Sequence, residues 1–135
     1  MSEFDFWVGE WEARWGEEGR GRNSITKELD GKVVFERFES PQLNGISVSV
    51  QCADGVWRQT WVDSDGNYLD FEGGPDGEAM ELRRAANGSV FRMRWHDVER
   101  DAFRWDWERS DDGGATWEPL WQIAYTRSTE VEFGS

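Results

Sequence analysis

The sequence has little cysteine, histidine or continuous apolar sequence, and each shortage excludes a class of protein. A single cysteine, Cys52, cannot form an internal disulfide, and a single histidine, His96, excludes metal sites built from several Cys or His ligands. We therefore expect neither a metal nor a cofactor. The longest apolar runs are about three residues, as at 33–35, which is too short for a membrane-spanning helix or the apolar region of a signal peptide. We expect a cytoplasmic protein.

Positive charge is also scarce. Fifteen basic residues stand against twenty-eight acidic ones, for a net charge of −13. An acidic surface repels phosphate backbones and anionic bilayers, so nucleic acid and membrane are not expected as partners. The sequence contains no Gly-x-Ser-x-Gly elbow, P-loop or dinucleotide fingerprint. With 135 residues, the chain is expected to form one domain over 1–135.

Aromatic residues are abundant instead. Ten tryptophans, eight phenylalanines and two tyrosines make up 15% of the chain. Each ring can bury roughly 150–250 Å², so a core can form without many leucines. An indole N–H needs a partner when it is buried. The tryptophans therefore indicate either a well hydrogen-bonded filled interior or a partly wet cavity.

Turn signals recur at intervals of roughly ten residues, as at Asp30-Gly31, Asn44-Gly45 and Asn87-Gly88. This spacing predicts short antiparallel strands joined in sequence and excludes a helical bundle. Ten strands are predicted, at 10–16, 21–29, 32–39, 45–53, 56–63, 67–73, 78–86, 89–98, 102–110 and 117–127.

Within these segments apolar and polar residues alternate, which gives each strand one dry and one wet face. The predicted dry faces are Trp11, Ala13 and Trp15; Ile46, Val48, Val50 and Cys52; Phe91, Met93 and Trp95; Phe103, Trp105 and Trp107; and Trp121, Ile123 and Tyr125.

Ten sequential strands with one apolar face can hide that face by closing the sheet on itself. The predicted fold is therefore all-β, a single antiparallel up-and-down β-barrel; a two-sheet sandwich would need longer connections. The crowded apolar residues of 3–9 predict a short helical turn that closes one end of the barrel. Ser2 is its predicted N-cap.

Three segments together resemble a bacterial domain family of unknown function with a lipocalin-like barrel. They are 4–11 (FDFWVGEW), 55–66 (GVWRQTWVDSDG) and 110–117 (SDDGGATW). The resemblance covers roughly residues 4–127 and implies a lipocalin-like fold, without an established activity.

Two of these motifs have structural counterparts elsewhere. Gly9-Glu10-Trp11 is similar to the Gly-x-Trp that opens lipocalins and other calycins, in which the Trp stacks with a basic residue of the last strand; Arg127 is the matching residue. Ser110-x-Asp112-x-Gly114-x-x-Trp117 resembles the Asp-box hairpin, a device that stabilises a turn. The resemblance therefore implies roles in stability for both motifs.

Several charged residues could carry chemistry if they faced the interior. Arg58 or Arg83 would suit a ligand carboxylate in an aromatic pocket. An inward pair of strand carboxylates would have a raised pKa suited to acid–base work. The candidates are Glu36, Glu39, Asp70, Glu72, Glu78, Glu81, Asp106 and Glu108. His96 is expected to point outward; only a register slip would place it where a barrel could bind haem.

These patterns favour a binding module that holds a small, mostly apolar or aromatic molecule inside the barrel. The predicted ligand-binding residues are Trp57, Trp61, Met93, Trp95, Trp105, Trp107, Tyr125 and Arg58. The sequence leaves two alternatives open. One is an enzyme that cyclises or isomerises a small metabolite in the same cavity. The other is a structural protein with a filled barrel, forming a homodimer through an outward patch of Val34 with Phe38, or Leu69 with Phe71.

Overall fold

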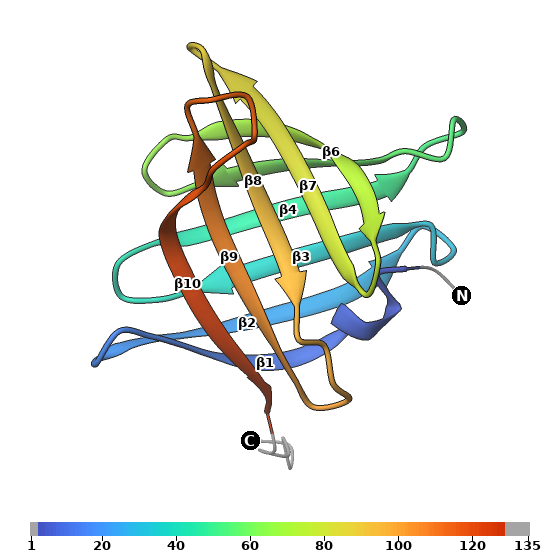
Figure 1. Cartoon of the computed structure of the whole chain (residues 1–135). Coiled ribbons are helices and arrows are strands. Elements are labelled where there is room, and N and C mark those ends of the chain that lie inside the picture. The colour runs from blue at the N-terminus through green and yellow to red at the C-terminus, as the bar shows by residue number, and fades with distance from the viewer. Residues whose placement is uncertain (1–2, 129–135) are drawn as a thin grey trace, which may run out of the picture.

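The ten predicted strands are present and form one closed antiparallel barrel. The computed structural model describes residues 3–128. The strands are β1 (Gly9–Trp15), β2 (Gly19–Glu28), β3 (Val33–Glu39), β4 (Asn44–Gln51), β5 (Trp57–Asp63), β6 (Tyr68–Asp76), β7 (Ala79–Ala86), β8 (Ser89–His96), β9 (Ala102–Ser110) and β10 (Glu118–Arg127). Each strand pairs with its neighbour in sequence, and β1 pairs with β10 to close the ring (Figure 1).

Tight turns make this sequential arrangement possible. Asn87 and Gly88, which connect β7 to β8, have φ values of 54° and 83°. A two-residue hairpin with positive φ at both positions matches the twist of the flanking strands, and Asn-Gly adopts it at little cost. The connections at both ends of the barrel are short, as the up-and-down prediction required.

A 3-10 helix, η1 (Asp5–Trp7), closes the end of the barrel where β1 begins (Figure 1). Phe4 and Trp7 are almost completely buried. Phe4 packs edge-on against Trp57 and Trp95, with ring centroids 5.1 and 5.0 Å away. The predicted helical closure is thus confirmed. Its cap is not as predicted, because Phe4 occupies the N-cap position without a side-chain hydrogen bond; Ser2 lies outside the described residues.

The predicted stack of Trp11 and Arg127 is also present. The two residues are partners across β1 and β10, and the Arg127 guanidinium lies 4.2 Å from the Trp11 ring centroid. Arg127 also donates a hydrogen bond to the Val8 carbonyl. Gly9 has φ +134°, and a Cβ there would lie 2.3 Å from Arg127 Nη1. A glycine at this position therefore lets the arginine tie the last strand to the closed end.

Most predicted dry faces point inward, but that of β4 is reversed. Val48 is 45% exposed, whereas Ser47 and Ser49 are buried. Ser47 donates to Glu36 Oε1 at 2.6 Å, and Gln59 Nε2 donates to Ser49 Oγ at 2.9 Å. The interior beside β4 is polar, so its apolar residues cover the outer surface. Alternation alone shows that a strand has two faces, not which one is inside.

The two residue pairs that could have formed an outward patch for a dimer do not point outward. Val34 and Phe38 are buried on the inner face of β3, and Phe71 is buried on β6. Leu69 is half-buried and packs against the core. None of the four offers an exposed apolar surface for a partner.

Within residues 3–128 there is no helix with the length and apolar character needed to span a bilayer.

Candidate functional site: an aromatic cavity in the barrel

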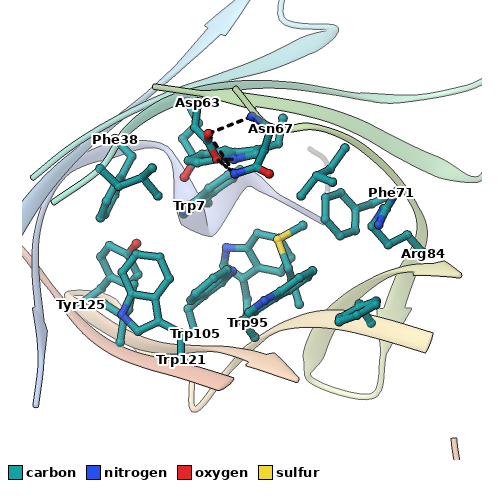
Figure 2. A pocket seen from close by; sticks show the side chains of 18 residues that line it. Trp7, Phe38, Asp63, Asn67, Phe71, Arg84, Trp95, Trp105, Trp121 and Tyr125 are labelled. Carbon is teal, nitrogen blue, oxygen red and sulfur yellow. Dashed lines mark hydrogen bonds between the residues drawn. The ribbon is translucent and has the colours of Figure 1, made fainter. Parts of the chain in front are cut away.

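The barrel encloses a cavity of about 390 Å³. Trp7 lines it at the closed end, and Leu43, Asp63 and Asn67 line it at the opposite end, where the β3–β4 and β5–β6 loops lie (Figure 2). Most of the lining is aromatic. This size falls within the range of pockets that hold small molecules.

The aromatic walls are held by ring contacts among themselves. Trp105 and Trp121 meet edge-on, with centroids 5.7 Å apart and planes at 89°. Trp107 stacks with Phe91 at 5.4 Å and meets Phe71 edge-on at 5.7 Å. Edge-on and offset arrangements are favourable for aromatic pairs. These contacts fix the orientation of the rings, so flat apolar faces are already in place around the cavity.

A polar cluster occupies one wall, beside β2, β3 and β10. Glu36 is 8% exposed and accepts hydrogen bonds from Ser47 Oγ at 2.6 Å and Asn23 Nδ2 at 2.9 Å. Asn23 Nδ2 also lies 3.5 Å from the Tyr125 hydroxyl. Burial raises the pKa of Glu36 above its usual range, although the two hydrogen bonds oppose the shift. Burial, followed by the nearby Glu36 charge, also raises the pKa of Tyr125.

A second charged side chain, Arg84, lines the cavity from β7. In the strand order of the ring, β7 stands nearly opposite β3. Figure 2 shows Arg84 beside Phe71, on the far side of the cavity from Tyr125. The Arg84 Nε is buried and has no hydrogen-bond partner among the described residues. In the polar cluster the Glu36 carboxylate is bonded within the protein, although Asn23 Oδ1 has no partner among the described residues, and the Arg84 Nε is likewise unpaired.

Asp63 lines the open end of the cavity, but its carboxylate is hydrogen-bonded to the β5–β6 loop and to Trp61. Its carboxylate accepts hydrogen bonds from Trp61 Nε1 at 2.7 Å and from the Asn67 side-chain amide at 3.1 Å. Partial burial opposes ionisation, yet these and further bonds from backbone N–H groups lower the pKa of Asp63. Asp63 is thus a satisfied carboxylate that fixes the β5–β6 loop and the edge of the Trp61 ring.

The structure brings most of the predicted ligand-binding residues to this cavity. The predicted residues that line it are Trp61, Met93, Trp95, Trp105, Trp107 and Tyr125. Trp57 lies at the closed end of the barrel, where it packs against Phe4 and donates a hydrogen bond from Nε1 to Glu3 Oε1 at 2.7 Å. Arg58 points to the outer face of β5, where it pairs with Asp54 and Glu72. Trp57 and Arg58 are therefore not part of the lining.

Phe91 and Trp121 line the cavity, as their predicted inward faces allow, although they were not among the predicted ligand-binding residues. Arg84 was not predicted at all; the sequence offered Arg58 and Arg83 as the candidate arginines. Arg83 is exposed and pairs with Glu81 on the outer face of β7. Period-two spacing carried the correct signal, because Arg84 shares its face with the buried Met80 and Leu82. Glu36 was one of eight candidate carboxylates, and nothing in the sequence singled it out.

His96 lies on the outer face, as expected, with Nε2 2.9 Å from Asp106 Oδ2. It does not line the cavity. Across residues 3–128, no three His, Cys, Asp or Glu side chains gather in a way that could hold a metal ion.

Comparison with known proteins assigns no relative: no protein-family model matches the chain, and no curated protein matches it. A closed barrel with a buried aromatic cluster around a cavity is compatible with binding a small molecule.

Proposed function

We propose that this protein binds a small, flat, mostly apolar molecule inside the barrel. The observation that carries the proposal is the cavity of about 390 Å³, whose walls are aromatic rings held in place by contacts with one another. Preformed, concave, mostly apolar sites with a few polar groups are typical of small-molecule binding. A cytoplasmic location and a relationship to lipocalin-like proteins belong to the same proposal. The barrel and the stack of Trp11 with Arg127 support that relationship.

Unpaired polar groups near the cavity also favour a binding site over an interior that is packed for stability alone. The indole N–H groups of Trp7 and Trp95, at the closed end, are buried and lack partners within the described part of the chain. Most buried donors in proteins are satisfied. An interior serving only stability would be expected to satisfy these groups or replace them with apolar ones.

The test is a titration with N-phenyl-1-naphthylamine, a neutral two-ring probe whose emission rises in apolar surroundings. We expect saturable binding by the wild-type protein. Leu69→Trp should weaken this binding at least about tenfold, because Leu69 lines the cavity and the larger ring would occupy it.

Val48→Trp is the matched control, since it adds a ring of the same size to the exposed face of β4. It should leave probe binding unchanged. The proposal fails if the wild-type protein does not bind the probe, or if Leu69→Trp binds it as well as Val48→Trp does.

An enzyme acting in the same cavity is the second candidate, and Glu36 is the observation in its favour. A buried carboxyl with a raised pKa, next to a tyrosine hydroxyl and an aromatic cavity, is suited to general acid catalysis of a cyclisation or isomerisation. If a substrate is found, Glu36→Gln should abolish turnover while retaining binding of the neutral probe. Unchanged turnover in that variant would exclude this role for Glu36.

A further inference from the structure

We propose that the molecule bound in the cavity carries an anionic group, such as a carboxylate on a flat apolar body, and that Arg84 binds this group. The inference rests on the proposed function and adds the chemical class of the guest.

Arg84 is in an unusual position for an arginine. It lies on the inner face of β7, on the same side as the buried Met80 and Leu82, and lines the cavity next to Phe71. Its Nε is buried without a partner, and it forms no ion pair with any residue of 3–128. Its neighbour Arg83 points outward and is paired with Glu81. The two arginines therefore lie on opposite faces of β7, and only Arg83 has an ion-pair partner.

The acidic side chains that share a groove with Arg84 have other partners. Arg84 also borders a shallow groove on the outer surface, in which Asp70 and Glu72 lie. Asp70 accepts a hydrogen bond from Thr60 Oγ1 at 2.8 Å, and Glu72 lies 3.6 Å from Arg58 Nε. No hydrogen bond or ion pair joins either carboxylate to Arg84 within residues 3–128.

The carboxyl group inside the barrel does not neutralise Arg84 either. Glu36 is on the nearly opposite wall, bonded to Ser47 and Asn23. Asp63, at the open end, is already bonded to Trp61 and Asn67. Both side chains are thus hydrogen-bonded to other residues of the protein and not to Arg84.

A guanidinium remains charged at any physiological pH, and its fork of donors matches a carboxylate. Partial burial of this charge among rings is unfavourable without a partner. A guest with an anionic group would satisfy the arginine while its rings pack on the aromatic walls. A neutral guest of the same shape would leave the cation unpaired and so bind more weakly.

The experiment compares 2-naphthoate with 2-naphthamide, which share their rings and differ in charge, as competitors that displace N-phenyl-1-naphthylamine. At neutral pH we expect the wild-type protein to prefer naphthoate by at least about tenfold. Arg84→Gln should remove this preference, and Arg84→Lys should keep part of it, because lysine retains the charge without the fork. Arg83→Gln should keep the full preference, which would show that naphthoate binds in the cavity and not in the outer groove.

Thermal unfolding monitored by circular dichroism shows that each variant is folded before binding is measured. Probe binding without a preference for naphthoate, or a preference that persists in Arg84→Gln, would overturn the role of Arg84 and leave the proposed function standing. Failure of the wild-type protein to bind the probe would overturn the proposed function and this inference with it.

Discussion

At the level of single side chains, two of the ionisable groups that line the cavity differ in how the protein binds them. Glu36 receives hydrogen bonds from Ser47 and Asn23, so its burial is compensated within the fold. The Nε–H of Arg84 is buried and donates no hydrogen bond to the described residues. Because most buried polar groups in proteins are paired, the unpaired Nε–H of Arg84 supports the proposed binding of an anionic guest there.

The raised pKa of Glu36 makes stability depend on pH in a predictable direction. The folded chain keeps a proton on Glu36 at pH values where the unfolded chain has released it. The free energy of unfolding contributed by this residue is therefore full below its ordinary pKa of 4.5 and declines as pH rises through the higher pKa of the folded state. Glu36→Gln removes the ionisation and should be more stable relative to wild type at pH 8 than at pH 4.

Urea unfolding of both proteins across this pH range measures the difference. Glutamine can still accept from Asn23 and donate to Ser47, so its own hydrogen bonds are retained. The exposed Glu118 supplies the control: Glu118→Gln should show no comparable change with pH. A stability difference between Glu36→Gln and wild type that is constant with pH would show that Glu36 ionises as easily in the folded chain as in the unfolded one.

The stacking of Arg127 on Trp11 is a contact between single residues that was predicted correctly from the sequence. The Gly-x-Trp motif predicted the pair, and the structure places the two 4.2 Å apart. The match came from the resemblance to calycins, which implied that a basic residue of the last strand stacks on this tryptophan; the motif by itself does not specify a partner so distant in sequence. Arg84 has no such motif, and its importance depends on the partners that it lacks.

At the level of strands and loops, the β9–β10 connection is organised by its own side chains. Ser110 Oγ accepts from the Gly114 N–H at 2.8 Å and donates to Asp112 Oδ1 at 2.7 Å. Asp112 Oδ1 accepts from the Thr116 N–H at 2.9 Å. Trp117 follows and covers the Arg92 guanidinium, which lies 3.9 Å from its ring centroid. The motif acts as a turn device, as its resemblance to the Asp-box implied.

Ser110→Ala should therefore lower the free energy of unfolding by about 1–2 kcal/mol, because the Gly114 N–H and the Asp112 carboxylate both lose a partner. Chemical denaturation measures this loss. Binding of the neutral probe should be unaffected, because Ser110 does not line the cavity. A loss of probe binding in a folded Ser110→Ala protein would mean that the loop reaches the cavity.

The β4 strand shows where sequence reasoning about elements fails. Its position between turns was predictable, because turn residues act locally. Its orientation was not, because Ser47 and Ser49 are inside only by virtue of Glu36 and Gln59, which lie on other strands. The inward face of a strand depends on partners distant in sequence.

At the level of the whole molecule, the barrel followed from the number of strands, their alternation and their short connections. The cavity did not follow, since ten tryptophans are equally consistent with a filled interior. Volume left between side chains depends on how rings such as Trp105 and Trp121 pack across the barrel, and composition does not contain that information.

The charge of the whole chain has its own consequence. A net charge of −13 on a molecule of 135 residues produces repulsion that is relieved when the chain expands. Salt screens this repulsion over about 8–10 Å at physiological ionic strength. The melting temperature at pH 7.5 should therefore rise as NaCl is increased from about 10 to 200 mM. A fall over this range would show that the ion pairs of the outer face outweigh the net repulsion.

The pairing of β6 with β7 covers only Glu72–Asp76 and Ala79–Arg83, after which the two strands separate next to Arg84. Beyond that point each of them is bonded on one side only, β6 to β5 and β7 to β8. Strand segments that are bonded on one side only open locally at a lower free-energy cost than segments paired on both sides. Local opening of this wall would therefore admit water to the cavity beside Arg84, while the rest of the ring stays paired.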